Sequence, residues 1–512
     1  MRQPLVAILV LGTSLAAWTS PSWGNGATLR DSRFGQRTLV DGLDRPTAVA
    51  FGPRRHLFVA EQGGRVFVAR PGRRPRLLLD ISDHVNSANE RGLLGIALDR
   101  RFRRNGRLYL LYTTDSGVPG PDAEGPQRAR LTRVVVHRPL EPRRLGRDPH
   151  ERVLLGRLHG TGPCPQAANA TDCIPSDATS HTIGTVRVDP RDGTLWVSEG
   201  DGAPEQFANA LAFRANDPVS LAGKVLHVGT DGRGLPGHPF CPGDGDLAHV
   251  CTKLYASGLR NPFRFGLSPR GEPLYAGAVG WYRFEALDAI RPGRDYGWPC
   301  YEGAAGGAVQ REPDYAPSRA CQARYSNGPS PPRPLVSYPH PVYQAIVGGP
   351  RIEGHSFPRR YRGRVFFGDY GRGRLWSLPM RDAFHTHGRQ IPFADGWTGV
   401  DIQEARRGVV YVDIASGSVE EIVYAPDHRP PSARPSVDPG DGRVPFIASF
   451  HAHAREAHGR RVFCYWSFGD GGTASHCNAR HRYTTPGHWP AGLRVTDGFK
   501  AVNRRVRVVA EG

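Results

Sequence analysis

Residues 186–197 read Val186-Arg187-Val188-Asp189-Pro190-Arg191-Asp192-Gly193-Thr194-Leu195-Trp196-Val197. Two short stretches of strand-forming residues flank a turn of Asp, Pro and Gly, a pattern typical of two antiparallel strands. The second stretch has five counterparts with an aliphatic or aromatic centre. They are Leu57-Phe58-Val59, Leu108-Tyr109-Leu110, Leu274-Tyr275-Ala276, Val365-Phe366-Phe367 and Val410-Tyr411-Val412. Six irregular copies of such a meander predict an all-β fold, and a six-bladed β-propeller more readily than a sandwich.

The composition narrows the class of protein. The 63 glycines and 46 prolines among 512 residues favour turns and short strands over long helices. The net charge of +19 comes from arginine, which supplies 64 of the 67 basic residues and is spread along the whole chain. Because no nucleic-acid-binding motif accompanies this charge, we expect no nucleic-acid partner, whereas attraction to anionic surfaces or polysaccharides stays open. No run of 18 apolar residues follows the N-terminus, so we expect no membrane span in the mature chain.

The N-terminus has the organisation of an export signal. Arg2 precedes an apolar run from Leu5 to Trp18, and Ser22-Trp23-Gly24 then places small residues at a cleavage position. We therefore expect residues 1–24 to be a signal peptide and the mature protein to be secreted or periplasmic.

Eight cysteines suit such an oxidising compartment. Eight cysteines allow many pairings, so pairing in chain order is a hypothesis. No Cys-x2–4-Cys spacing is present, which disfavours a zinc site. The four pairs in chain order are Cys164 with Cys173, Cys241 with Cys251, Cys300 with Cys321, and Cys464 with Cys477.

A second module follows the long domain. Four prolines between positions 430 and 439 make residues 426–444 a semi-rigid, Pro-rich linker. In residues 445–510, Trp466 and Phe468 alternate on one expected strand and Asp470-Gly471 turns the chain, which predicts a small β-sandwich.

This module resembles the PKD domain. The resemblance rests on Trp466-Ser467-Phe468-Gly469-Asp470-Gly471 and on Val495-Thr496-Asp497. PKD modules act as spacers or as adhesive, carbohydrate-associated appendages. The resemblance therefore implies contact with a polysaccharide or a cell surface through residues 445–510.

Four strings in the long domain carry a second resemblance. They are Glu90-Arg91-Gly92-Leu93-Leu94-Gly95, His181 with the following Glu199-Gly200-Asp201-Gly202, Ser257-Gly258-Leu259-Arg260-Asn261-Pro262-Phe263-Arg264-Phe265, and Asp295-Tyr296-Gly297-Trp298-Pro299. In this order, across about residues 38–425, the strings resemble the glucose/sorbosone dehydrogenase family. That family includes soluble quinoprotein sugar dehydrogenases and Hedgehog-interacting-protein-like propellers.

The resemblance implies a secreted quinoprotein oxidoreductase. Such an enzyme oxidises aldose sugars at the anomeric carbon, passes a hydride to pyrroloquinoline quinone (PQQ) and then needs an external electron acceptor. By resemblance, His181 is the general base and Arg260 stabilises charge on the reactive carbonyl of the quinone. Asn261 and Gln206 contact the cofactor or the substrate.

The cofactor site implied by the resemblance has further members. Glu90 belongs to it, and calcium polarises the quinone while the backbone carbonyls of Gly280 and Trp281 hold the ion. The Lys and the closely spaced Arg pair that grip the cofactor's carboxylates in the family have no counterpart here, and Arg372 and Arg374 are the candidate substitutes.

Other positions also depart from the family. Glu90 stands where soluble glucose dehydrogenases carry Gln, Ser180 replaces an Asp, and Ala278 and Ala286 occupy acidic positions. Two further hypotheses stay open beside the dehydrogenase. One is a non-catalytic carbohydrate- or protein-binding propeller with the PKD module for adhesion or spacing. The other is a calcium-dependent, lactonase-like propeller.

Overall fold

The computed structural model describes residues 27–115, 122–145, 150–158, 162–165, 172–268, 270–306, 308–340, 344–457 and 461–512. The expected signal peptide, residues 1–24, lies outside the described residues. Strands dominate, and the prediction of an all-β fold is confirmed. The helices of the described chain are α1 (Phe102–Asn105), α2 (Arg319–Asn327) and short 3₁₀ helices at Pro53–Arg55, Ser82–His84, Ala210–Ala215, Val250–Lys253 and Arg359–Tyr361.

Six sheets of four or five strands make up the described chain as far as residue 424. The first three are, in spatial order: β3 (Pro46–Phe51), β4 (Leu57–Glu61), β5 (Arg65–Ala69) and β6 (Arg76–Asp80); β7 (Leu93–Leu98), β8 (Arg107–Thr113), β9 (Gln127–Val135) and β10 (Arg152–Leu155), with β11 (Ile174–Ser176) also on β9; and β12 (Ile183–Val188), β13 (Leu195–Glu199), β14 (Lys224–Val228), β15 (Leu254–Ser257) and β19 (Arg294–Asp295).

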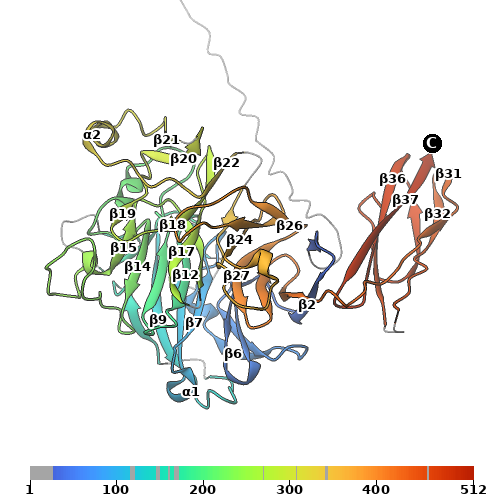
Figure 1. Cartoon of the computed structure of the whole chain (residues 1–512), viewed down its shortest axis with the longest axis horizontal. Helices are drawn as coiled ribbons and strands as arrows, with labels where there is room; N and C mark the ends of the chain where they lie inside the picture. The colour runs from blue at the N-terminus through green and yellow to red at the C-terminus, as the bar shows by residue number, and fades with distance from the viewer. Residues whose placement is uncertain are drawn as a thin grey trace, which may run out of the picture.

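The other three sheets follow the same plan. They are: β16 (Pro262–Ser268), β17 (Gly271–Ala278), β18 (Phe284–Ile290) and β22 (Val336–Pro339); β23 (Ile346–Val347), β24 (Arg364–Asp369), β25 (Arg374–Pro379), β26 (Ile391–Asp395) and β1 (Thr28–Leu29); and β27 (Gly399–Ala405), β28 (Gly408–Asp413), β29 (Ser418–Tyr424) and β2 (Phe34–Val40). A separate hairpin of β20 (Tyr301–Ala305) and β21 (Ala308–Arg311) lies with α2 at one end of the sheets, and α1 lies at the other end (Figure 1).

The strands expected from their aromatic or aliphatic centres are the second strands of the six sheets, namely β4, β8, β13, β17, β24 and β28. Each contributes an aromatic side chain that is fully buried. These side chains are Phe58, Tyr109, Trp196, Tyr275, Phe366 and Tyr411. Burial of such large apolar surfaces between neighbouring sheets is the main source of stability here.

The first strands of the sheets form a closed ring, in which β3, β7, β12, β16, β23 and β27 each contact the next and β27 contacts β3 again. Arg264 of β16 is fully buried in this ring. Its guanidinium donates to the carbonyls of Leu94 and Gly184 at 2.9 and 2.6 Å, and to those of Val400 and Thr47 at 2.7 and 3.0 Å. One side chain therefore connects its own strand with β7, β12, β27 and β3.

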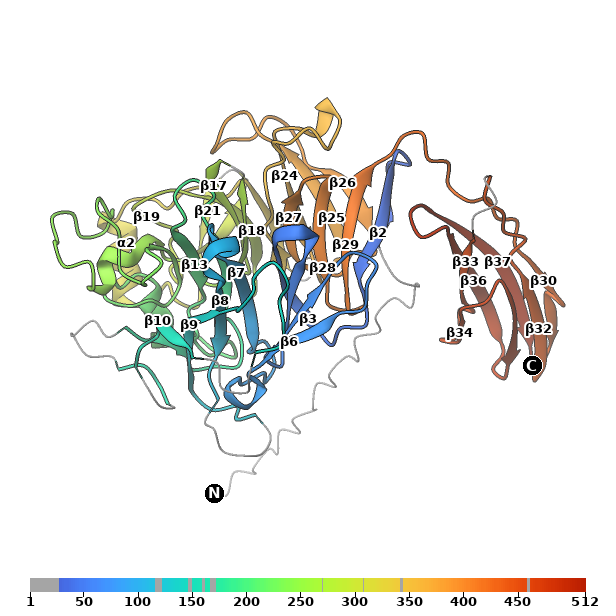
Figure 2. The same cartoon turned by 90° about the horizontal axis from the view of Figure 1, so that it is seen from below.

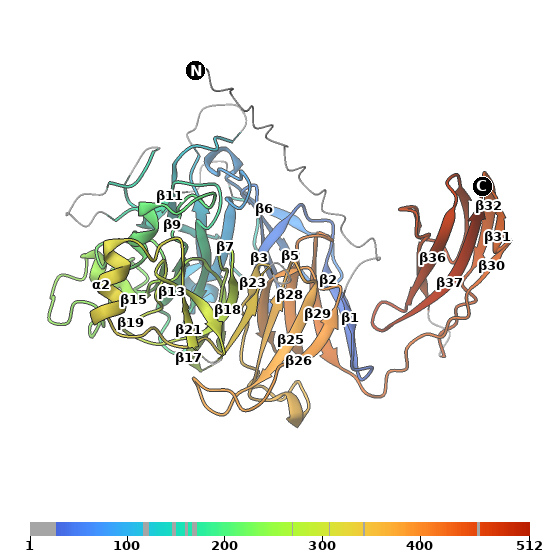
Figure 3. The same ribbon diagram turned by 90° about the horizontal axis from the view of Figure 1, so that it is seen from above.

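Strand β2, near the N-terminus, completes the sixth sheet and so closes the ring of sheets. β2 pairs antiparallel with β29, so the sixth sheet combines the start of the domain with its end (Figures 2 and 3). Phe34 of β2 is buried against Phe357, Phe393 and Tyr424, with ring centroids 4.8–5.2 Å apart.

The C-terminal module has its own core. Its two sheets contain β30 (Ser436–Asp438), β32 (Phe446–His451) and β35 (Asn478–Tyr483), and β31 (Asp441–Arg443), β37 (Ala501–Glu511), β36 (Gly487–Thr496), β33 (Phe463–Ser467) and β34 (Thr473–Ala474). Trp466 and Phe468 are buried between them. The prediction of a small β-sandwich agrees with this arrangement.

Two strands, β30 and β31, lie within residues 426–444, which the sequence predicts to be a linker. The prolines explain the difference. Pro435, Pro439 and Pro445 flank the two strands instead of interrupting them, so no hydrogen bond of the sheet is lost.

The described chain contains four disulfides, and they pair the eight cysteines in chain order. The hypothesis of sequential pairing is confirmed. No helix among the described residues is both long and apolar enough to cross a membrane.

Candidate functional site

His181 lies in the loop before β12 in a backbone conformation that non-glycine residues seldom adopt, with φ of 52°. Its backbone N–H donates to Glu90 Oε2 at 3.1 Å, and its carbonyl accepts from Gly202 N at 2.9 Å. A Cβ at Gly200 would lie 2.0 Å from the His181 carbonyl oxygen, so only glycine fits there. Such held, uncommon conformations concentrate at functional sites.

The side chain of His181 is 5% exposed and lies beside Glu205, with 3.5 Å between Nε2 and Glu205 Oε2. Burial, followed by the positive charge of Arg260, lowers the pKa of His181 well below its ordinary value. The imidazole is therefore neutral at neutral pH and is able to accept a proton.

Glu90 is exposed at the surface, but surrounding protein atoms and the carboxylate of Glu205 limit the hydration of its carboxyl group. Desolvation by its surroundings, together with the charge of Glu205, raises the pKa of Glu90, although the hydrogen bond from His181 N opposes the change. A carboxyl at this position thus anchors the His181 backbone.

Arg260 lies between β15 and β16, and its side chain is almost fully buried. Its Nη1 donates to the carbonyl of Val279 at 3.2 Å and also to the carbonyl of Gly280. The guanidinium carbon lies 5.6 Å from the centre of the Trp298 ring, a favourable position for a cation over an aromatic face.

Asp201 connects Arg260 with Trp298. Its backbone N–H donates to the Arg260 carbonyl at 2.8 Å, and its Oδ2 accepts from Trp298 Nε1 at 2.7 Å. Burial raises the pKa of Asp201 to about 6, against the opposing effect of the Arg260 charge. The three side chains form one buried, connected group.

Several expected site residues come together. His181 contacts Glu90, and Arg260 contacts Gly280. Trp281 completes the connection, because its Nε1 donates to the carbonyl of Glu205 at 2.6 Å.

Two expected residues remain outside this group. Gln206 is adjacent in sequence to Glu205 but exposed. Arg372 is exposed, and its backbone N–H donates to Asp369 Oδ1 at 2.7 Å, while its side chain makes no contact with His181 or Arg260 in the described chain.

The sequence alone revealed no role for Glu205, Asp201 or Trp298. Asp201 and Trp298 lie inside two of the four strings that resemble the family, but the strings do not reveal that the two residues touch. Glu205 lies in no such string, and only the folded loop brings its carboxylate to His181.

The residues can be tested against the expected cofactor. Asn261 Oδ1 is buried without a hydrogen-bond partner among the described residues, and it lies next in sequence to the buried Arg260. An unpaired buried acceptor is costly unless a bound molecule donates a hydrogen bond to it, so Asn261 fits a hydroxyl or N–H group of a bound sugar or cofactor.

The expected calcium site fits less well. The carbonyl of Gly280 already accepts from the guanidinium of Arg260. Because a divalent cation and a guanidinium would compete for this oxygen and repel each other, Gly280 in this arrangement does not fit a calcium ligand.

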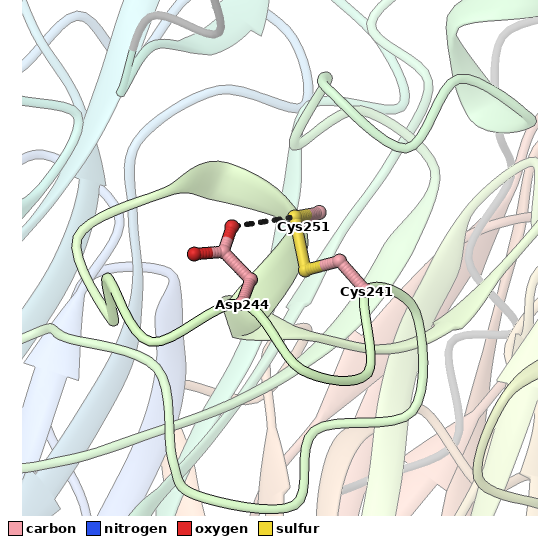
Figure 4. A group of neighbouring side chains, drawn as sticks. All are labelled: Cys241, Asp244 and Cys251. Atoms are coloured by element: carbon pink, nitrogen blue, oxygen red, sulfur yellow. Dashed lines mark hydrogen bonds between the residues drawn. A yellow bond between two sulfur atoms is a disulfide. The ribbon is translucent and has the colours of Figure 1, made fainter.

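Another cluster resembles a metal site but lacks the chemistry. Cys241, Asp244 and Cys251 lie together (Figure 4). Both cysteines are joined in a disulfide, so neither offers a thiolate, and Asp244 Oδ2 lies 2.7 Å from His249 Nδ1. The cluster is a turn closed by the disulfide between Cys241 and Cys251, in agreement with the disulfide hypothesis.

The ring of sheets and the buried His–Arg site define an all-β, propeller-type class of protein. Within that class, the model of the Glucose / Sorbosone dehydrogenase family matches residues 43–415, and a PKD domain model matches residues 434–510. The chain belongs to the glucose/sorbosone dehydrogenase family and carries a C-terminal PKD domain.

Relatives and solved structures agree with this family. The HIPL1 protein of Arabidopsis thaliana is 26% identical over 343 residues, which are 58% of this chain and 45% of that protein. The chain thus spans about half the length of the curated relatives that it matches.

Two solved structures share the fold. The PQQ-bound aldose sugar dehydrogenase of Streptomyces coelicolor has a TM-score of 0.53 at 20% identity, covering 77% of this chain and 99% of that chain. The apo-form soluble aldose sugar dehydrogenase of Escherichia coli has a TM-score of 0.54 at 16% identity, covering 76% and 99%.

Proposed function

We propose that the protein is an exported, PQQ-dependent dehydrogenase that oxidises aldose sugars at the anomeric carbon and passes the electrons to an external acceptor. The observation that carries the proposal is the neutral, buried imidazole of His181 held in the same site as the buried guanidinium of Arg260. Family membership supports the reaction class, and the four disulfides suit an exported protein.

Each residue has a defined task in this proposal. His181 Nε2 takes the proton of the anomeric hydroxyl, because burial keeps the imidazole unprotonated. Arg260 stabilises the negative charge that develops on the neighbouring oxygen, and Trp298 with Asp201 holds Arg260 in place. When bound, PQQ would supply the carbonyl that accepts the hydride. We derive no step through calcium, since Arg260 engages the Gly280 carbonyl.

The architecture belongs to the same proposal. We propose that the six sheets are the six blades of a propeller over about residues 38–425, because their first strands close a ring. Residues 426–444 would join it to the PKD domain at 445–510. Within this segment, β30 and β31 pair with β32 and β37 of the PKD domain.

A titration of the purified full-length chain with PQQ, followed by mixed aldoses, tests the proposal. We expect saturable binding and bleaching of the oxidised quinone when sugar is added. His181→Ala should reduce turnover by about 10²–10⁴-fold and leave quinone binding intact. His387→Ala, an exposed histidine, is the control. An unchanged rate in His181→Ala would exclude His181 as the base.

A non-catalytic binding propeller is the second candidate, and one observation favours it. Of the two candidate substitutes for the family's carboxylate-gripping cations, Arg372 is exposed and apart from Arg260, and Arg374 is paired with Asp395. Glu90, Asp201 and Glu205 add negative charge to the site. A tricarboxylate cofactor would be repelled by that charge. Absence of PQQ binding at tens of micromolar would favour this candidate, and screening of glycans would follow.

A further inference from the structure

A groove of about 570 Å³ lies between the outer strands of the first sheet and the loop that follows β9. Its walls carry Arg70, Arg73, Arg74, Arg76 and Arg143, and its floor includes His56. All five arginines are exposed. The volume is in the range of ligand sites in proteins, and the lining is cationic instead of apolar.

The positive charge of this basic groove is largely unneutralised. Glu141, the one acidic residue in the lining, is already paired with Arg54 at 3.0 Å. The guanidinium groups of Arg73, Arg74 and Arg143 have no ion-pair partner among the described residues. Like charges gathered in one groove repel one another and destabilise the fold. A bound anion would reduce this repulsion and stabilise the folded protein.

His56 gives an independent sign of the positive potential. The ring is almost fully buried, and Arg70 Nε lies 3.2 Å from His56 Nε2. Burial, and after it the charges of Arg70, Arg76 and Arg54, lowers the pKa of His56. The arginines therefore act together on the floor of the groove.

The basic groove lies at the opposite end of the sheets from His181. β3 begins beside the site, since Gln62 N donates to the carbonyl of Arg45 and Gln62 Nε2 donates to that of Asn89, next to Glu90. β3 then runs six residues, about 20 Å, to the loop that carries Arg54. A ligand in the groove would leave the catalytic site free.

We infer that this basic groove binds an acidic polysaccharide through its carboxylate or sulfate groups. Guanidinium groups form paired hydrogen bonds with the two oxygens of a carboxylate, or with two of the three terminal oxygens of a sulfate group. No exposed large apolar side chain lines the groove, so the anchors of a membrane-binding surface are missing from its lining. The lining also holds no Phe, Tyr or Trp ring on which a nucleic-acid base could stack, and the His56 ring is buried.

Binding of the full-length protein to immobilised polygalacturonate tests the inference. We compare the triple variant Arg73→Ser, Arg74→Ser, Arg143→Ser with a control triple, Arg319→Ser, Arg389→Ser, Arg434→Ser. The control removes the same charge from exposed arginines elsewhere. We expect binding that weakens with added salt, an affinity reduced about tenfold in the groove triple, and less than about threefold in the control.

Stability gives a second measurement. Without polysaccharide, the groove triple should unfold at the same temperature as the parent or above it, because repulsion is removed. Equal loss of affinity in both triples would overturn the inference, as would no binding of the parent, or a larger effect of the groove triple on phosphatidylglycerol vesicles or duplex DNA than on polygalacturonate.

Discussion

The side chain of Arg264 alone forms hydrogen bonds that connect five strands of the ring. Its five N–H groups meet four backbone carbonyls of four different first strands, and burial lowers its pKa only to about 10, so it remains charged at neutral pH. Arg264→Met would leave those carbonyls without donors at the centre of the ring. We expect a loss of about 3–5 kcal/mol in the free energy of unfolding, measured by urea denaturation.

The control for Arg264 lies just beyond the same strand. Arg270 is exposed, with an ion pair to Glu353 at 3.2 Å, and Arg270→Met should cost no more than about 1 kcal/mol. If the two variants lose equal stability, the contacts of Arg264 with four other first strands do not stabilise the ring as we propose.

The pH dependence of turnover follows from His181, provided that the proposed dehydrogenase is correct. Because burial and Arg260 lower the pKa of His181, its neutral, proton-accepting form persists to more acidic pH than for a free histidine. We expect kcat/KM to stay constant through neutral pH and to fall only well below pH 6.5, the ordinary histidine value. A fall centred near pH 6.5 would contradict this assignment.

At the scale of elements, the sequence predicted strongly patterned strands and missed weakly patterned ones. The six second strands carry a large buried side chain between apolar neighbours, and this pattern depends only on local sequence. β23 has two residues, Ile346–Val347, and is a strand only because β24 lies beside it. β10 and β11 likewise depend on pairing with β9, which no local pattern reveals.

Closure by β2 is an element whose contribution can be measured. Phe34→Ala removes a buried ring from its packing against Phe357, Phe393 and Tyr424, which should cost about 3–5 kcal/mol and increase amide hydrogen exchange along β29. Phe51→Ala is the matched control, because this ring is 40% exposed at the end of β3. Unchanged exchange in β29 after Phe34→Ala would show that β2 does not secure the ring.

At the scale of the whole molecule, the site was partly predictable. Strings around His181 and Arg260 pointed to both residues, and the fold brings them together. The identity of their neighbours was not predictable, since Glu205 and Trp298 lie on other loops of the chain and only the fold brings them to His181 and Arg260. The competition between Arg260 and a cation for the Gly280 carbonyl is likewise a property of the folded chain.

The PKD domain contacts the propeller-type domain through the turn between β36 and β37. Phe499 O accepts from Gln36 N at 2.6 Å, and Lys500 Nζ donates to the carbonyl of Ser32 at 2.5 Å. Asp497 Oδ2 also lies 2.6 Å from Nε2 of His428, which belongs to the segment between the two domains. These contacts predict a docked domain in place of a freely moving one.

Asp497 is the residue on which docking can be tested. Although burial acts in the opposite direction, hydrogen bonds from His428 and from backbone N–H groups lower the pKa of Asp497. Its stabilising effect is therefore present above the unfolded-state pKa of about 3.9 and is lost as the pH falls through the lower folded-state value.

Asp497→Asn keeps the backbone contacts of Oδ1 and removes the charge facing His428. At neutral pH we expect proteolysis of residues 426–434 to rise roughly tenfold. Asp470→Asn, which removes the partner of His481 within the PKD domain, should leave this cleavage unchanged. Equal cleavage of both variants and the parent would show that the junction is held by other contacts.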